Sequence, residues 1–93
     1  MSEIILYTKD YCPYCIQAKA LLRRKGVEFT EIDIQRDPSL VDEMITRSNG
    51  GRTVPQIFIG DTHVGGASDL FKLDSEGGLD PLLISFRSKL AAL

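Results

Sequence analysis

The chain has 93 residues, 43% of them hydrophobic, which is enough for one hydrophobic core but not for two, so we expect a single domain over residues 1–93. Its 11 basic and 13 acidic residues give a net charge of -2 without a basic block, which argues against a nucleic-acid partner. No segment has the length of a membrane span and the N-terminus lacks a signal-sequence pattern, so we expect a cytoplasmic protein that is not attached to a membrane.

The first third of the chain predicts a strand, a helix and a second strand. Ile4–Thr8 is an apolar run typical of a strand buried on both faces, and we place it in the centre of a sheet. Pro13 suits the first position of a helix that ends at Gly26, and this helix has a stripe at helical spacing formed by Cys15, Ala18 and Leu22. Residues 28–33 form the second strand, which we expect to lie parallel to the first after a right-handed crossover.

Two further helices are predicted by Asp-Pro pairs, in which an acceptor side chain precedes a proline at the first helical position. Asp37-Pro38 precedes an apolar face made of Leu40, Val41, Met44 and Ile45. Asp80-Pro81 precedes a closing helix whose packing face contains Leu82, Leu83, Phe86 and Leu90.

The segment between these two helices predicts a hairpin followed by another helix. Gln56–Ile59 has a strand pattern that ends at the turn pair Gly60-Asp61, and 62–64 is short enough for an edge strand. Gly65-Gly66 then leads into a helical stretch with apolar Leu70, Phe71 and Leu73.

The two cysteines of the chain stand together as Cys12-Pro13-Tyr14-Cys15, at the start of the first predicted helix. Unpaired N–H groups and positive potential at a helix N-terminus favour a thiolate, the form that attacks disulfides. Cys12 is expected to face solvent at the cap and to act as the nucleophile, whereas Cys15 lies on the buried stripe and is expected to resolve the mixed disulfide. A closed zinc site needs four ligands, which two cysteines and one histidine of a single chain do not provide.

The order of the predicted elements is that of the thioredoxin-like fold, an α/β fold with a four-stranded mixed sheet flanked by helices. Within this fold, three segments resemble dithiol glutaredoxins, especially the small bacterial ones: Cys12–Cys15, Arg52–Ile59 and Gly65–Leu70. The resemblance runs from Ile4 to about Leu83 and leaves the role of Arg87–Leu93 open. Thioredoxin itself would carry a Trp before the first cysteine, and this chain has no Trp.

The resemblance implies glutathione as reductant and co-substrate, with no tightly bound cofactor and no metal. In the family, the proline matching Pro55 follows a cis peptide bond, and the residue before it, here Val54 after Thr53, pairs with the cysteinyl part of glutathione. The chain after Gly65 also offers the start of a helix, where the N–H groups of Ala67 and Ser68 could receive a carboxylate and Asp69 an ammonium, with Gly66 allowing close approach. A plain helix cap by Ser68 or Asp69 is the alternative reading of that segment.

Three side chains are placed to complete a glutathione groove. Lys9 and Arg52 are expected to meet the glycyl carboxylate, and Tyr14 is expected to line the groove between the cysteines. Either basic residue could instead be an ordinary solvated charge. His63 is interpreted as an exposed residue of the edge strand, without a role as base or ligand.

The sequence thus predicts a monomeric, glutathione-dependent thiol–disulfide oxidoreductase that reduces protein disulfides and glutathionylated proteins, with ribonucleotide reductase as a family-level candidate substrate. Three alternatives stay open at this point. They are a thioredoxin-like enzyme served by a flavin-dependent reductase, a carrier that shares an iron–sulfur cluster between two subunits, and an adaptor that binds in the groove without turnover.

Overall fold

A computed structural model describes the backbone of residues 3–91 and the side chains up to residue 86. Eight elements follow one another: β1 (Ile4–Thr8), α1 (Pro13–Arg24), β2 (Thr30–Asp33), α2 (Pro38–Arg47), β3 (Gln56–Ile59), β4 (Thr62–Gly65), α3 (Ala67–Ser75) and α4 (Leu79–Ala91). The predicted elements are all present in this order. Leu90 and the side chains of residues 87–93 lie outside the described part.

The sheet has four strands in the order β2-β1-β3-β4, with β1 in the interior as expected. β1 pairs in parallel with β2, and β3 pairs antiparallel with both β1 and β4, so the sheet is mixed. All five residues of β1 are buried, because helices cover both faces of the sheet. The second strand begins at Thr30, later than expected, since residues 28 and 29 do not pair with β1.

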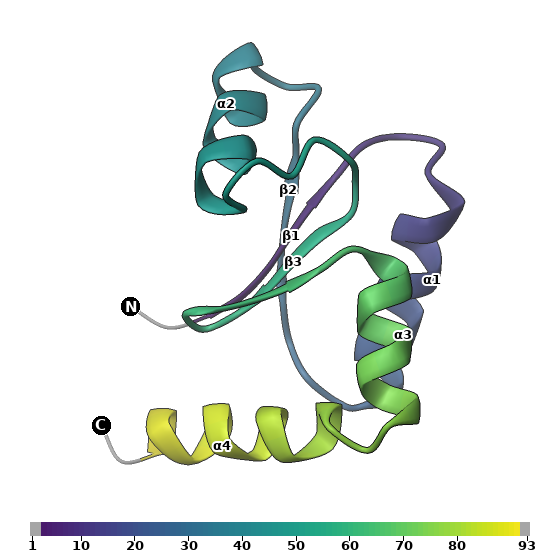
Figure 1. The fold of residues 1–93 in the computed structure, drawn as a ribbon, viewed down its shortest axis with the longest axis vertical. Coiled ribbons are helices and arrows are strands. Elements are labelled where there is room, and N and C mark those ends of the chain that lie inside the picture. Colours follow the sequence, from purple (N-terminus) through teal and green to yellow (C-terminus); the bar gives the residue numbers. More distant parts are fainter. Residues whose placement is uncertain (1–2, 92–93) are drawn as a thin grey trace.

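Helices pack on both faces of the sheet, with α2 on one side and α1, α3 and α4 on the other (Figure 1). A hydrophobic core lies on each face. The larger core joins one face to α1, α3 and α4, and its fully buried members include Leu6, Leu22, Ile57 and Leu70. The smaller core joins the other face to α2 through Met44, which packs with Ile5, Tyr7 and Phe58. This alternation follows from the period of two in a strand, which sends neighbouring side chains to opposite faces.

The closing helix begins at Leu79, two residues before Pro81, so the expected start at Asp80-Pro81 is wrong. The Leu82 N–H donates to the Gly78 carbonyl (3.4 Å), which makes Gly78 the residue that precedes the helix. Pro81 therefore lies within the first turn, where a backbone N–H has no partner in the helix and its loss costs nothing. This start also places Leu79, which is fully buried, in the larger core.

A polar contact anchors α2 on the sheet. The Tyr7 hydroxyl donates to Glu43 Oε2 (2.6 Å) and accepts from Arg47 Nη1 (2.7 Å). The Arg47 guanidinium also lies 5.1 Å from the centre of the Phe58 ring. These contacts hold the C-terminal end of α2, from which the chain runs on to the candidate site.

Candidate active site

Cys12 is the N-cap residue of α1 and is largely buried. Its Sγ accepts a hydrogen bond from the Cys15 N–H (3.2 Å), and its thiol lies 3.8 Å from the carbonyl oxygen of Val54, to which it can donate. Its exposed fraction is 7%, so the expectation that Cys12 faces solvent is wrong. The physical reason is tertiary, because Val54, 42 positions further along the chain, covers the sulfur.

Cys15 lies one helical turn deeper and is 1% exposed, which confirms its predicted place on the buried stripe. Burial, followed by its hydrogen bond with Cys12, raises the pKa of the Cys15 thiol to about 12, and a hydrogen bond with the Lys9 backbone opposes this shift. Cys15 therefore keeps its proton at neutral pH and can donate it to the sulfur of Cys12. The two thiols of the pair are chemically unequal.

Replacing Cys15 by Ala is expected to make the stability of the reduced protein less sensitive to alkaline pH. The pKa of Cys15 rises from 9.0 in the unfolded chain to about 12 in the folded one, so the unfolded chain loses this proton first. The contribution of Cys15 to stability is then fully present below pH 9 and is lost between pH 9 and pH 12.

Urea unfolding under reducing conditions, at about pH 8 and about pH 10.5, measures this effect. Between these two pH values, the free energy of unfolding of the unmodified protein should fall by on the order of 1 kcal/mol more than that of the Cys15→Ala variant. Tyr7, whose pKa is also raised by burial, is present in both proteins and cancels in the comparison. Equal losses in the two proteins would contradict the raised pKa of Cys15.

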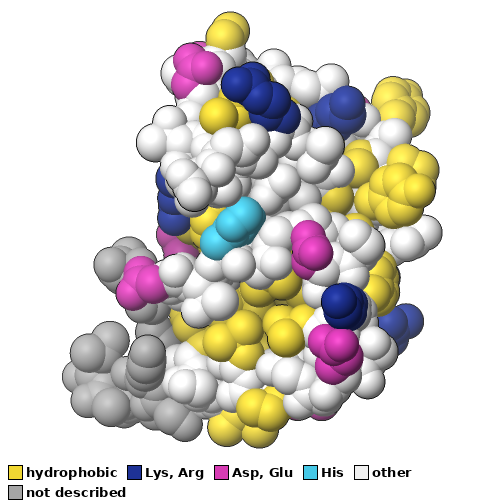
Figure 2. Space-filling view, viewed as in Figure 1, with side chains coloured by type: hydrophobic (Ala, Val, Ile, Leu, Met, Phe, Trp, Pro, Cys, Tyr) yellow, Lys and Arg dark blue, Asp and Glu magenta, His cyan; other side chains and the backbone are white. Residues whose placement is uncertain are grey.

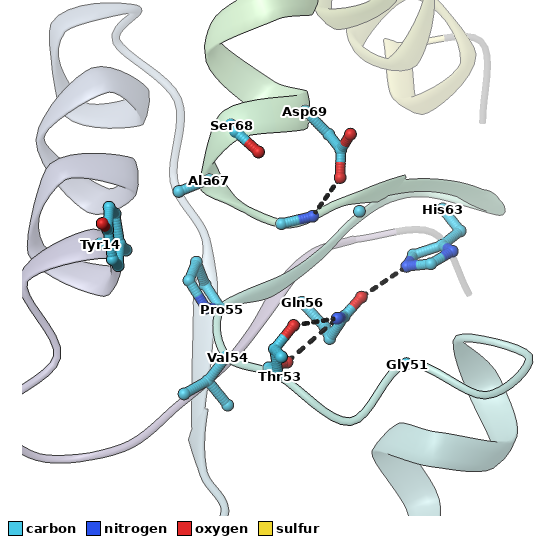
Figure 3. A pocket seen from close by; sticks show the side chains of 12 residues that line it. Tyr14, Gly51, Thr53, Val54, Pro55, Gln56, His63, Ala67, Ser68 and Asp69 are labelled. Carbon is cyan, nitrogen blue, oxygen red and sulfur yellow. Dashed lines mark hydrogen bonds between the residues drawn. The ribbon is translucent and has the colours of Figure 1, made fainter.

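A cavity of about 580 Å³ lies where three elements meet. Neither cysteine lines it, but Val54, whose carbonyl oxygen lies 3.8 Å from Cys12 Sγ, does. Tyr14 of α1 contributes one wall, the segment 53–56 another, and the segment 65–69 at the start of α3 a third (Figure 3). Tyr14 is 63% exposed, so its ring is available at the mouth of the cavity. The peptide bond between Val54 and Pro55 is cis, as the sequence resemblance implied.

The third wall presents the N-terminus of α3. The first helical hydrogen bond runs from the Leu70 N–H to the Gly66 carbonyl (3.0 Å), so the N–H groups of Ala67, Ser68 and Asp69 precede the helical ladder. Asp69 Oδ2 accepts from the Gly66 N–H (2.9 Å), which shows that Asp69 does act as a cap. The structure thus contains the helix cap by Asp69, while the N–H groups of Ala67 and Ser68 remain those predicted to receive a carboxylate.

Of the ten residues predicted for the glutathione groove, eight line this cavity: Tyr14, Thr53, Val54, Pro55, Gly66, Ala67, Ser68 and Asp69. Lys9 and Arg52 are exposed and do not contribute to its lining. Arg52 is nevertheless flanked in the chain by Gly51 and Thr53, which do line it. Among the described residues, no group of three or more His, Cys, Asp or Glu side chains is placed to hold a metal ion.

Four further residues line the cavity that sequence reasoning did not select: Gly51, Gln56, His63 and Gly65. A signal for Gln56 was available, because it is the polar residue in an otherwise apolar strand and a buried amide requires partners. His63 was interpreted as exposed and without a role. It is exposed, but its ring accepts or donates a hydrogen bond at 2.8 Å to the Gln56 amide.

A second hollow adjoins the first one on the β4 side. It has a volume of about 360 Å³ and lies between β4, α3 and α4, with Val64, Leu73 and Leu82 at its base. Figure 2 shows hydrophobic side chains gathered there, while charged side chains of both signs are scattered over the rest of this face. His63 and Asp69 line both hollows, so the two hollows adjoin each other at the edge of the sheet.

None of the helices in the described part is long and apolar enough to cross a membrane.

Comparisons with known proteins agree with this geometry. The family model described as Glutaredoxin matches residues 4–64. Glutaredoxin 3 of Escherichia coli strain K12 is 55% identical over 83 residues, which cover 89% of this chain and 99% of the relative.

Solved structures show the same likeness. A glutaredoxin from Brucella melitensis is 57% identical, with a TM-score of 0.76 over 89% of each chain. A buckwheat glutaredoxin solved as a glutathione complex is 27% identical, with a TM-score of 0.83 over 91% of this chain and 79% of the other. Family model, sequence relatives and fold agree, and the chain described here belongs to the glutaredoxin family.

Proposed function

We propose that this glutaredoxin reduces glutathione mixed disulfides and protein disulfides, with Cys12 as the nucleophile, Cys15 as the resolving thiol and glutathione as the reductant. The observation that carries the proposal is the position of Cys12 Sγ, at the start of α1 and 3.8 Å from the Val54 carbonyl in the wall of the cavity. A bound peptide disulfide would thus lie beside the attacking sulfur.

The proposed reaction has two exchanges that balance. The Cys12 thiolate attacks the glutathione sulfur of a mixed disulfide, so that the substrate leaves as a thiolate and takes up a proton while Cys12 carries glutathione. A second glutathione thiolate attacks the glutathione sulfur of this intermediate, which releases Cys12 and forms glutathione disulfide. For a protein disulfide, Cys15 attacks the mixed disulfide between Cys12 and the substrate, and two glutathiones then reduce the Cys12–Cys15 disulfide.

Binding of the peptide fits the polar groups of the cavity. Val54 has a backbone N–H and C=O with which an extended cysteinyl residue can pair, and ionisation of Cys12 removes the thiol donor that now faces that carbonyl. The N–H groups of Ala67 and Ser68 suit the γ-glutamyl carboxylate. Asp69 uses Oδ2 for the cap, so its other oxygen is the one proposed to receive the γ-glutamyl ammonium. Lys9 and Arg52 are proposed for the glycyl carboxylate.

The remaining sequence expectations stay proposals. We propose that residues 1–93 form one domain, which is supported by the single sheet that unites the described elements. We also propose that the protein acts as a monomer in the cytoplasm on disulfide-containing or glutathionylated proteins, among which ribonucleotide reductase is a candidate. The net charge of -2 supports a protein that does not bind nucleic acid.

The test is reduction of a glutathionylated protein by the purified chain, coupled to glutathione reductase and NADPH. We expect a rate proportional to the glutaredoxin concentration that requires glutathione. Thioredoxin reductase with NADPH, supplied in place of glutathione and its reductase, is the matched control and should not support turnover. A rate with thioredoxin reductase that equals or exceeds the rate with glutathione would overturn the proposal.

A further inference from the structure

The side chain of Gln56 lies at the base of the cavity and is 5% exposed, although it begins an apolar strand. Its amide nitrogen donates to the Thr53 carbonyl (3.0 Å) and to Thr53 Oγ1 (3.4 Å). Its amide oxygen lies 2.8 Å from His63 Nε2 (Figure 3). A buried amide with all of these partners is held in one orientation.

The orientation of this amide determines the role of His63. Because a carbonyl oxygen only accepts, the Thr53 carbonyl requires the NH₂ group of Gln56 on its side, which turns the amide oxygen toward the histidine. His63 Nε2 must then carry a proton and donate.

Packing holds both side chains in place. The His63 ring stacks on Phe58, its cross-strand neighbour, with ring centres 4.8 Å apart and planes 24° apart, and Phe58 belongs to the smaller core. On the other side, Gly51 leaves room for the amide, since a Cβ at Gly51 would lie 2.9 Å from the Gln56 side chain and 2.6 Å from Ser48 Oγ. A chain of contacts therefore runs from the core through His63 and Gln56 to Thr53.

These contacts determine which groups of Thr53 can donate and which can accept a hydrogen bond. Its hydroxyl oxygen accepts from Gln56, which leaves the hydroxyl hydrogen free to donate into the cavity that Thr53 lines. Its carbonyl oxygen, which would repel an anion, is occupied by the same amide. Thr53 therefore offers a donor, and not an acceptor, to a ligand in the cavity.

We infer that Gln56 and His63 are positioning residues that make the Thr53 hydroxyl a donor to the glycyl carboxylate of glutathione. This inference rests on the proposed function. The glycyl end is chosen because Thr53 follows Arg52 in the chain, while the start of α3 at the opposite wall serves the γ-glutamyl end. Both side chains line the cavity, and the action inferred for them runs through the hydrogen bonds that Gln56 makes with Thr53.

The experiment compares two mixed disulfides of one small thiol as substrates in the coupled assay, one made with glutathione and one made with its glycyl ethyl ester, because the glutathione moiety of the mixed disulfide is the one that Cys12 takes up. Glutathione at one fixed concentration is the reductant for both. Gln56→Leu keeps the size of the side chain and removes its amide. We expect the preference for the free acid over the ester, measured as the ratio of kcat/KM values, to fall by about tenfold or more in Gln56→Leu, the effect of one hydrogen bond to a charged acceptor. Thr53→Val should lower the ratio by a similar factor, and the double variant should fall no further.

His63 is tested with a matched pair. His63→Phe keeps the ring stack on Phe58 but removes the donor, and it should lower the acid-to-ester ratio, whereas His63→Gln supplies an amide donor and should restore part of it. The ratio compares two ligands on the same protein, so a loss of folded protein cancels. An unchanged ratio in Gln56→Leu, or additive effects in the double variant, would overturn the inference while leaving the proposed function intact. An unmodified protein with no glutathione-dependent activity would overturn both.

Discussion

Replacement of Cys12 by Ser should abolish the reduction of a glutathionylated protein, with a fall in rate of about a thousandfold or more. The hydroxyl of serine does not ionise near neutral pH at this site and cannot form a disulfide. Cys15→Ser should retain much of this activity, because glutathione itself attacks the Cys12 mixed disulfide. The coupled assay with glutathione reductase measures both rates.

With a protein disulfide as substrate, Cys15→Ser should reduce the activity strongly, in contrast to its small effect on deglutathionylation. Without a resolving thiol, the intermediate between Cys12 and the substrate protein persists until glutathione cleaves it, and non-reducing electrophoresis should reveal it in Cys15→Ser. Cys15→Ala is the control for the size and polarity of the buried site, since Cys15 is 1% exposed. Loss of deglutathionylation in Cys15→Ser but not in Cys12→Ser would invert the assigned roles.

Gly65→Ala should destabilise the fold and weaken glutathione binding together. Gly65 has φ +115°, a conformation that residues with a Cβ rarely adopt, and a Cβ there would collide with the Asp69 carboxylate. Displacing Asp69 breaks its hydrogen bond with the Gly66 N–H and moves the oxygen proposed for the ligand ammonium. We expect a loss of about 2–4 kcal/mol in unfolding free energy and a several-fold rise in the KM for a glutathione mixed disulfide, whose glutathione moiety occupies the cavity.

The matched control for this variant is Gly77→Ala. Gly77 also has positive φ (+79°), but a Cβ there would meet nothing within 4 Å, so the change adds backbone strain alone. Gly77→Ala should cost about 1–2 kcal/mol and leave the KM for the glutathione mixed disulfide unchanged. Urea unfolding and the dependence of turnover on the mixed-disulfide concentration measure both variants. A KM that rises equally in the two would show that backbone strain, and not the position of Asp69, governs binding.

Much of the fold could be predicted because its signals are local. The apolar run Ile4–Thr8, the helix start at Pro13 and the cap at Asp37, which accepts from the Ser39 N–H at 2.8 Å, each depend on residues within one turn or strand. Predictions were wrong where the first residue of a helix or strand is determined by contacts with residues far away in the sequence. The closing helix begins at Leu79 because that residue enters the core, and residue 30 begins β2 because its partner is Ile5.

The glutathione groove was predicted from three sequence segments, and eight of its ten residues line the cavity that the structure contains. Gln56 and His63 were not predicted as site residues. Gln56 stands out as the polar residue of an apolar strand, but nothing in the sequence near either residue indicates that their side chains meet. Their inferred role depends on the pairing of β3 with β4, which brings His63 Nε2 to 2.8 Å from the Gln56 amide oxygen. It also depends on the hydrogen bond that the Gln56 amide nitrogen donates to the Thr53 carbonyl. A residue whose role depends on a cross-strand neighbour has no local signature.

The sequence by itself determined the chemistry of this protein: two thiols at a helix start, the place of Cys15 on the buried face of that helix and the family that the flanking segments resemble. Helix periodicity and capping depend on residues that are close in the sequence, so they can be predicted from the sequence alone. Only the tertiary structure decided that Cys12 is covered, since the Val54 carbonyl that faces it comes from 42 residues away. It also decided which groups surround the cavity, because α1, the segment before β3 and the start of α3 meet only once the sheet has formed.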